Sequence, residues 1–150
     1  VVILGLEETH ERLLEHSSLP FPVLIKGNLD RVEIRNGKIR IIDYKTGKVE
    51  GRHVALSHWD GLTTDVKYEK IIQVLAYAYI YEAKSGGREI EAGIISFKNM
   101  KSGFLPFKFK EGKSDITVVT KEISTHYIEQ LVLLLGEILD PDVSFKEAIL

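Results

Sequence analysis

The 150-residue sequence contains no cysteine, only one methionine and one tryptophan, and no long apolar run. Without cysteine these residues build no disulfide framework, thiol nucleophile or iron–sulfur cluster, and the chain suits a reducing compartment. The longest apolar stretches, such as residues 131–135, are far shorter than the roughly 20 residues that a membrane span requires. We therefore expect a cytoplasmic protein without a membrane segment.

The composition is that of a folded domain, with 44% hydrophobic and 28% charged residues. This length buries an adequate core without disulfides or structural zinc. No repeat, low-complexity tract or linker divides the chain, which predicts a single domain over residues 1–150. Because position 1 is Val and not Met, we expect this domain to be a piece of a longer protein.

The overall net charge of −2 argues against a nucleic-acid partner, but the charges are unevenly distributed. Residues 26–52 contain eight basic and four acidic residues, a local net charge of +4 that leaves −6 for the rest of the chain. Residues 98–113 contain five lysines, opposed only by Glu111 and interleaved with phenylalanines. Binding of a polyanion therefore remains open.

Alternation of apolar and polar residues around Asn36-Gly37 predicts two paired strands, Val23–Arg35 and Lys38–Lys45. Residues 1–16 suit either a strand or a helix. A helix is expected over residues 67–84, with a stop at Gly86-Gly87. Residues 89–98 and 104–110 are expected to form a second hairpin around Ser102-Gly103. A second helix, capped by Thr120, is expected to carry an apolar stripe from Ile123 to Ile138 and to end before Pro141. This order predicts a mixed sheet with helices packed on it.

A two-residue turn at Asn36-Gly37 makes the numbers of facing residues sum to 73, so that Asp30 faces Asp43. By alternation both carboxylates share a face with Lys45. Opposed carboxylates repel each other, and a hard cation such as Mg²⁺ would compensate. Lys45 is then placed to touch a phosphate or the attacking water. In the alternative interpretation the acids lie at a wet end of the sheet, with Lys45 as a surface ion pair.

On the predicted helix, Gln73 and Tyr77 are four residues apart and project from the same face. A tyrosine at this position is also explained by packing between helix and sheet. The amide of Gln73, among apolar neighbours, needs hydrogen-bond partners if it is buried. Gln73 is therefore the stronger indication of a functional site on this helix.

Three motifs follow one another along the chain: Gly27-x-x-Asp30-Arg31, then residues 41–47 (Ile-Ile-Asp-Tyr-Lys-Thr-Gly), then Gln73-x-x-x-Tyr77. In this order and spacing the sequence resembles the RecB-type branch of the PD-(D/E)XK nuclease superfamily, which includes RecB-like and AddB-like nuclease domains. The resemblance implies an α/β fold, a restriction-endonuclease-like mixed β-sheet flanked by helices.

The resemblance also implies roles for individual residues. Asp30, Asp43 and the backbone carbonyl of Tyr44 would bind Mg²⁺ or Mn²⁺, and Lys45 would position or activate the attacking water. Gln73 and Tyr77 would orient this lysine or the DNA backbone. Relatives usually carry a further His or Glu ligand upstream, for which Glu7, Glu8 and His10 are the local candidates, although His10 fits a surface position better than a ligand position.

We therefore expect a metal-dependent DNA nuclease domain of recombination or repair, exonuclease rather than endonuclease, in a helicase–nuclease type of protein. Its partners would be DNA and a helicase subunit or domain. Arg31 and Lys48 would contact the DNA backbone, or else belong to an ordinary solvated face. One alternative is a non-catalytic, nuclease-like scaffold that binds DNA or a helicase. Another is an interaction domain in which the hairpin from Phe97 to Phe109 offers an edge strand or stacks single-stranded bases, or simply buries its phenylalanines.

Overall fold

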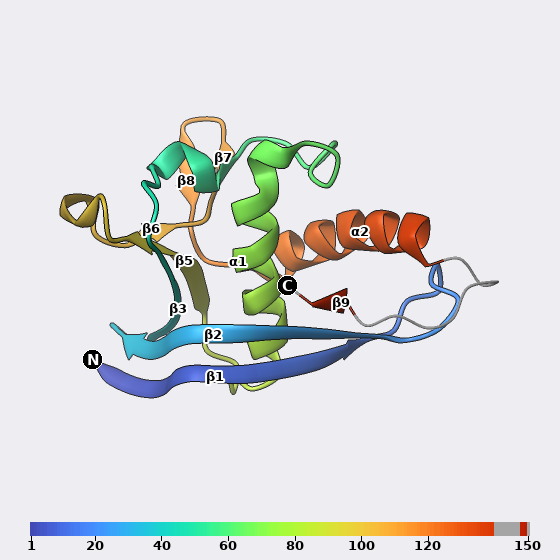
Figure 1. The fold of residues 1–150 in the computed structure, drawn as a ribbon, viewed down its shortest axis with the longest axis horizontal. Coiled ribbons are helices and arrows are strands. Elements are labelled where there is room, and N and C mark those ends of the chain that lie inside the picture. Colours follow the sequence, from blue (N-terminus) through green and yellow to red (C-terminus); the bar gives the residue numbers. More distant parts are fainter. Residues whose placement is uncertain (140–147, 150) are drawn as a thin grey trace.

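The structure is a computed structural model that describes residues 1–139 and 148–149. Its described elements form two sheets and two α-helices (Figure 1). The strands are β1 (Val2–Leu14), β2 (Val23–Arg35), β3 (Lys38–Lys45), β4 (Ala55–Leu56), β5 (Ile90–Ser96), β6 (Leu105–Pro106), β7 (Lys108–Glu111), β8 (Ser114–Ile116) and β9 (Ala148–Ile149). The helices are α1 (Glu69–Glu82) and α2 (Lys121–Ile138), with short 3-10 helices η1 (Gly51–Val54), η2 (Val66–Tyr68) and η3 (Met100–Ser102).

The main sheet has the strand order β1-β2-β3-β5-β6, and β9 pairs with β2. It is mixed, because β3 pairs with β5 in parallel and β9 with β2 in parallel, whereas the other neighbours are antiparallel. Helix α1 crosses this sheet and contacts β1, β2, β3 and β5. Helix α2 packs against α1, where the buried Tyr127 donates a hydrogen bond of 2.9 Å to the carbonyl of Ile72. The α/β fold with a mixed sheet flanked by helices is thus confirmed.

The β2–β3 hairpin has the predicted register, from Arg35 opposite Lys38 to Arg31 opposite Ile42. Its turn residues Asn36 and Gly37 have φ of 53° and 78°, as a type I′ turn requires. The ladder of paired residues ends at Arg31 and Ile42. Asp30 and Asp43 therefore lie just beyond the regular pairing, and their side chains are free to form the contacts described below.

The buried side of β2 changes along its length. The apolar Val23, Ile25 and Leu29 are buried at odd positions and the apolar Val32 at an even one, next to the buried charge of Glu33. The half-buried Asp30 lies at this change, so simple alternation does not hold through it. Strand β1 is also distorted nearby, since Glu7 has φ of 49°, in the left-handed region that non-glycine residues seldom adopt. Both strands thus depart from regular geometry beside the candidate site.

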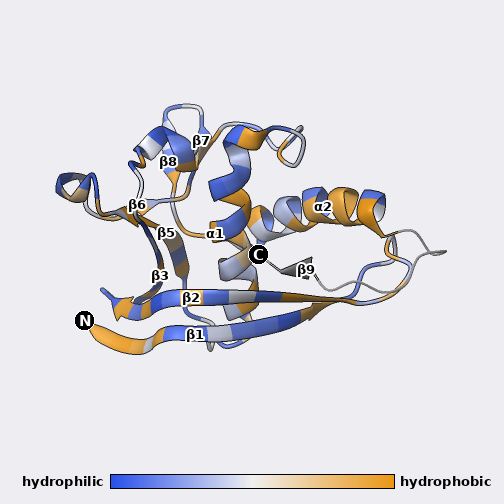
Figure 2. Ribbon diagram, in the orientation of Figure 1, coloured by the Kyte–Doolittle hydropathy of each residue, from blue (hydrophilic) through white to orange (hydrophobic). Residues whose placement is uncertain are grey.

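The ambiguous N-terminal segment forms strand β1, which pairs with β2 along nearly its whole length. Its polar and apolar residues do not alternate cleanly, and as an edge strand it leaves many apolar side chains exposed. Figure 2 shows the hydrophobic N-terminal end of this strand, where Val2 is 57% and Leu6 is 54% exposed.

The second predicted hairpin is only partly right. Strands β5 and β6 pair antiparallel through Gly93 opposite Pro106, but β7 then joins β4 and β8 in a separate small sheet. Pro106 has no N–H to donate, which limits the ladder at this edge. The continuous strand expected over residues 104–110 is thus divided between two sheets.

The two helices lie close to their predicted positions. Residues 66–68 form the 3-10 helix η2, capped by Asp65, and α1 follows directly and buries most of its surface. Thr120 caps α2 as predicted, because its side chain accepts a hydrogen bond of 3.2 Å from the N–H of Ile123. Pro141, the expected stop of α2, lies outside the described residues. In the described part of the chain, neither helix is long and apolar enough to cross a membrane.

Candidate functional site

Asp30 and Asp43 approach each other where β2 and β3 leave their paired register. The carboxylate of Asp30 accepts a hydrogen bond of 2.8 Å from the backbone N–H of Tyr44. This bond ties β2 to β3 one residue beyond Asp43. The predicted pair of acids is therefore present, with Asp30 held by the main chain of the neighbouring strand.

Asp43 is almost fully buried, and its charge is in an unfavourable environment. Burial raises the pKa of the Asp43 carboxyl, the neighbouring Lys45 lowers it, and the nearby Asp30 raises it again, with a net increase. The ammonium of Lys45 lies 2.9 Å from Oδ2 of Asp43 as an ion pair. That buried oxygen accepts no well-directed hydrogen bond within the described structure. Such an oxygen beside a second carboxylate suits a cation as a further partner.

Lys45 connects the acids to helix α1. Its ammonium donates a hydrogen bond of 2.6 Å to Oε1 of Gln73, and Nε2 of Gln73 donates one of 2.9 Å to the hydroxyl of Tyr77. Gln73 thus has the two partners that its polar amide requires. The structure brings together all five residues that the sequence analysis placed in a catalytic site: Asp30, Asp43, Lys45, Gln73 and Tyr77.

Tyr77 packs tightly at the inner side of the site. Burial, followed by the charge of Asp43, raises the pKa of the phenol to about 12, so the hydroxyl is neutral near pH 7. The ring lies over Gly27, where an added Cβ would be 2.7 Å from Cε1 of Tyr77. The glycine of the first motif thus makes room for the tyrosine of the third.

Two cavities open beside Lys45 and Gln73. One, of about 480 Å³, is lined by residues 63–66 and by Glu69 and Ile72 of α1. The other, of about 260 Å³, is lined by residues 46–49 and by Glu69 and Lys70. Sequence reasoning missed the part of Glu69, although it lies four residues before Gln73 on the same helical face. No sequence signal singles out the loop of residues 63–66.

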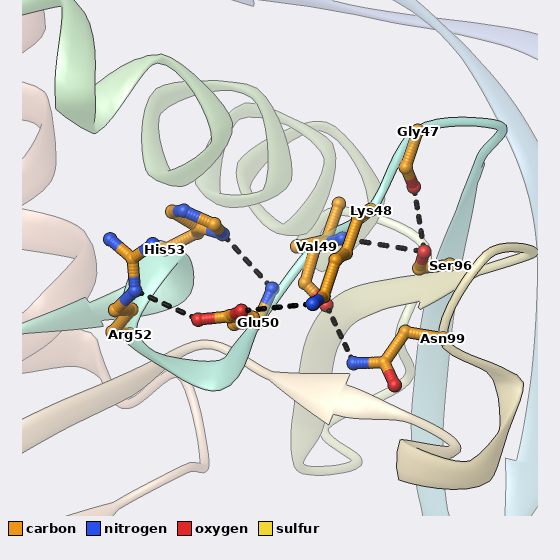
Figure 3. Close-up of polar contacts among 8 residues, drawn as sticks. All are labelled: Gly47, Lys48, Val49, Glu50, Arg52, His53, Ser96 and Asn99. Atoms are coloured by element: carbon orange, nitrogen blue, oxygen red, sulfur yellow. Dashed lines mark hydrogen bonds and ion pairs between the residues drawn. The ribbon is translucent and has the colours of Figure 1, made fainter.

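The loop that follows Lys45 is held by polar contacts with Ser96 of β5 and with Asn99, which directly precedes η3 (Figure 3). The fully buried Ser96 donates a hydrogen bond of 2.6 Å to the carbonyl of Gly47 and accepts one of 3.3 Å from the N–H of Val49. Asn99 donates one of 3.2 Å to the carbonyl of Val49. These contacts fix the main chain beside the second cavity.

The two residues expected to contact DNA lie in different environments. Arg31 donates a hydrogen bond of 2.7 Å to Glu33, a buried carboxylate that also accepts one of 3.1 Å from Arg35. Lys48 lines the second cavity beside Lys45, with its ammonium 3.6 Å from Glu50. Lys48 is therefore directly at the candidate site, whereas Arg31 is held in an ion-pair network on β2.

No group of three or more His, Asp or Glu side chains that could hold a metal comes together among residues 1–139 and 148–149. His10 is largely buried, unlike the surface position considered for it, and it lies 3.2 Å from Glu8 and edge-on to the ring of Tyr81. It does not join Asp30 and Asp43. A cation here would therefore have two carboxylates as side-chain ligands, a set that suits Mg²⁺, which retains several waters.

The phenylalanines of residues 97–109 serve different purposes. Phe107 is fully buried in the core, whereas Phe97 is 52% exposed and stacks on Tyr44 with ring centroids 5.5 Å apart. The simple interpretation that these rings face the core thus holds for Phe107 and fails for Phe97.

Comparison with known proteins gives the same picture as the geometry. The sequence model of a family described as the PD-(D/E)XK nuclease superfamily matches residues 3–148. The chain is 31% identical to an ATP-dependent helicase/nuclease subunit of Listeria welshimeri in an alignment of 100 residues that covers 62% of this chain and 8% of that protein. It is 34% identical to an ATP-dependent helicase/nuclease subunit of Listeria monocytogenes over 85 residues, which are 57% of this chain and 7% of that protein. The matched segment is thus less than a tenth of either relative. No solved structure matches the chain.

Proposed function

The chain belongs to the PD-(D/E)XK nuclease superfamily, and we propose on this basis that it is a Mg²⁺-dependent deoxyribonuclease domain that hydrolyses phosphodiester bonds, exonuclease rather than endonuclease. The observation that carries the proposal is the continuous set of contacts from Asp43 through Lys45 and Gln73 to Tyr77, with Asp30 beside it. Each of these residues comes from one of the motifs that the family resemblance rests on.

The residues divide the work of hydrolysis between them. Asp30 and Asp43, with the backbone carbonyl of Tyr44, would hold the cation. When bound, a divalent ion there supplies positive charge to the scissile phosphate and makes a nearby water more acidic. Lys45 holds the attacking water through its ammonium group and offsets negative charge on the phosphate.

Gln73 and Tyr77 act as positioning residues for Lys45. The Gln73 carbonyl oxygen accepts from the ammonium and so orients it, while the Tyr77 hydroxyl accepts from the amide nitrogen. Because the two ends of the amide have different partners, the side chain has one favoured orientation. The neutral phenol adds no charge that would compete with Asp43 for Lys45.

We further propose that residues 1–150 are the nuclease domain of a longer helicase–nuclease protein that acts on DNA in recombination or repair in the cytoplasm. The names of the two relatives support this assignment, since both are helicase/nuclease subunits. A helicase subunit or domain of the same assembly would then be its protein partner.

One observation favours a second candidate function, a non-catalytic scaffold with a nuclease fold that binds DNA or a helicase. Within the described residues, no third acidic or histidine side chain joins Asp30 and Asp43. Two features oppose the scaffold. First, two neighbouring carboxylates, one of them buried, destabilise a fold, and a site without catalytic function gives no physical reason to keep them. Second, the ammonium of Lys45 is held in one position by its hydrogen bond to Gln73, as a catalytic lysine requires.

The test is calorimetric titration of Mg²⁺ and Mn²⁺ into the chain and into its Asp30→Asn and Asp115→Asn variants, with cleavage of linear and circular DNA measured on the same samples. Asp115 lies on the exposed strand β8 of the small sheet and provides the matched control for loss of one carboxylate. We expect metal binding and cleavage to disappear in Asp30→Asn and to persist in Asp115→Asn.

Cleavage of linear but not circular DNA would support the exonuclease assignment. Metal binding that depends on Asp30 without any cleavage would favour the scaffold, and equal metal binding by all three proteins would exclude the paired-carboxylate site. Lys45→Ala, compared with Lys121→Ala, separates chemistry from metal binding, because it should abolish cleavage while metal binding persists, and thermal unfolding establishes that both variants are folded.

A further inference from the structure

Basic side chains continue from the candidate site along the surface formed by η1 and the first turn of α1. Lys48 and Lys70 line the cavity that also contains Lys45. A neighbouring cavity of about 250 Å³ is lined by Arg52, His53 and Lys67, together with Ala55 and Tyr68. Helix α1, which carries Lys70, contacts η1, which carries Arg52 and His53, so the residues that line the two cavities lie on neighbouring elements.

We propose that Lys48, Arg52, Lys67 and Lys70 form a strip that binds the phosphates of one DNA strand on one side of the scissile bond. This inference rests on the proposed nuclease function, since it names where the substrate backbone leaves the catalytic residues. We call these four residues the phosphate strip.

The main chain that carries Lys48 and Arg52 is held in place by hydrogen bonds and ion pairs within the protein itself. Figure 3 shows the carboxylate of Glu50 between Lys48 and Arg52, which lie 3.6 and 2.9 Å from it. The N–H of Glu50 donates a hydrogen bond of 2.9 Å to Nδ1 of His53, which closes the first turn of η1. Together with the contacts of Ser96 and Asn99, these bonds leave little of the loop to be ordered when a ligand binds.

His53 contributes a neutral hydrogen-bond donor to the same surface. Its Nδ1 is occupied as an acceptor, and burial, followed by the charges of Arg52 and Lys70, lowers its pKa. The ring is therefore uncharged near pH 7 and carries its proton on Nε2. A phosphate oxygen is a suitable acceptor for this N–H.

The balance of charge along the surface favours an anion. Lys48 and Arg52 share Glu50, and Lys67 lies 3.7 Å from Asp65. Lys70 is half-buried and has no acidic ion-pair partner in the described part of the chain, and Glu69 also lines the cavity that it shares with Lys45. Lys45 is paired with Asp43, and without it the four cations of the phosphate strip stand against the three acids Glu50, Asp65 and Glu69. Lys70 therefore contributes the least compensated charge of the phosphate strip.

A phosphodiester backbone is the occupant that these features favour. The surface is continuous with the residues proposed to cut a phosphodiester bond, because Lys45 and Gln73 line the same cavity as Lys48 and Lys70. Flexible cations without a base-reading groove bind phosphates regardless of sequence. An acidic protein segment is the competing occupant, and the experiment distinguishes the two.

The experiment measures binding of a fluorescent single-stranded 20-mer DNA by anisotropy at several salt concentrations, without added metal and in a Lys45→Ala background. The test variant carries Arg52→Ala and Lys70→Ala, and the control carries Lys110→Ala and Lys121→Ala, which remove the same charge from exposed positions on β7 and α2. We expect the dissociation constant of the test variant to rise about tenfold and its salt slope to fall by about 1.4, roughly 0.7 for each lost phosphate contact. The control should stay within about twofold of the parent.

Equal salt slopes in the test and control variants would overturn the proposal. So would an unchanged affinity for DNA combined with a lost affinity for poly-glutamate, which would assign the surface to an acidic protein partner. The binding experiment involves no hydrolysis, so a protein without nuclease activity can still confirm the phosphate strip. A protein that cleaves DNA, but whose salt slope is unchanged in the test variant, refutes the phosphate strip and leaves the proposed nuclease function intact. Thermal unfolding of each variant establishes that it is folded.

Discussion

The side-chain amide of Gln73 has two chemically different ends, and the site uses both. Its oxygen accepts from the charged ammonium of Lys45, and its nitrogen donates to the hydroxyl of Tyr77. A glutamate at this position would add a charge, and a leucine would leave Lys45 with Asp43 alone. In the sequence, Gln73 stood out as a polar amide among apolar neighbours that would need hydrogen-bond partners if buried. The structure supplies these partners, Lys45 and Tyr77.

Glu33 is a buried charge on β2, and it stabilises the strand that carries Asp30. Burial alone would raise the pKa of the Glu33 carboxyl, but the hydrogen bonds and charges of Arg31 and Arg35 outweigh it and lower the pKa below its ordinary value. The charged form is thus favoured in the folded state. The stabilisation is present above the unfolded pKa and is lost as the pH falls through the lower, folded one.

We therefore predict that Glu33→Gln lowers the free energy of unfolding by about 1–3 kcal/mol at pH 7, because two arginines lose a charged acceptor. The difference from the parent should shrink as the pH falls below about 4. Urea unfolding at pH 7 and pH 3 measures it, with the exposed Glu111→Gln as control. A loss of stability that is the same at both pH values would show that the charge of Glu33 is not its cause.

At the scale of elements, the first hairpin was predictable residue by residue. Asn36-Gly37 fixes a two-residue turn, the turn fixes the register, and the register places Asp30 near Asp43. The change of buried side within β2 was not predictable, because it depends on β1 and α1 packing against the strand. The conformation of the loop after Lys45 was also not predictable from the sequence, because Ser96, which donates a hydrogen bond to Gly47, lies 49 residues away along the chain.

The close packing of α1 on β2 gives a prediction at this scale. A Cβ at position 27 would lie 2.7 and 2.9 Å from two ring atoms of the buried Tyr77, so Gly27→Ala forces the ring or the helix to move. We expect a loss of about 1–3 kcal/mol in the free energy of unfolding, together with lower nuclease activity as Gln73 shifts.

The matched control is Gly136→Ala on α2, where an added Cβ has nothing within 4 Å. Alanine is the better helix former, so this variant should gain up to about 1 kcal/mol. Chemical denaturation of both variants measures the contrast. Equal effects of the two substitutions would mean that the contact between Gly27 and Tyr77 does not limit the packing.

At the scale of the whole molecule, the sequence predicts the main sheet better than the small one. Strands β4, β7 and β8 are two to four residues long and carry no periodic pattern of their own. Beside them Trp59 stacks on Phe109 of β7 and on His126 of α2, contacts between segments far apart in the chain. Local patterns cannot reveal such pairings, and none of the three motifs that carry the resemblance lies in these strands.

The free edge of the main sheet has a consequence for how the isolated chain behaves in solution. The outer side of β1 has no strand partner among the described residues, and the first six residues of the chain expose five large apolar side chains, those of Val1, Val2, Ile3, Leu4 and Leu6. An edge that combines unpaired backbone groups with apolar surface is a template for intermolecular strand pairing.

We predict that light scattering from concentrated samples grows with time and that Leu4→Lys suppresses this growth, whereas Leu133→Lys, at an exposed apolar position on α2, leaves it unchanged. Equal growth of the scattering in both variants would show that another surface causes the aggregation. Suppression by Leu4→Lys alone would show that the resistance of the protein to aggregation depends on the edge of β1.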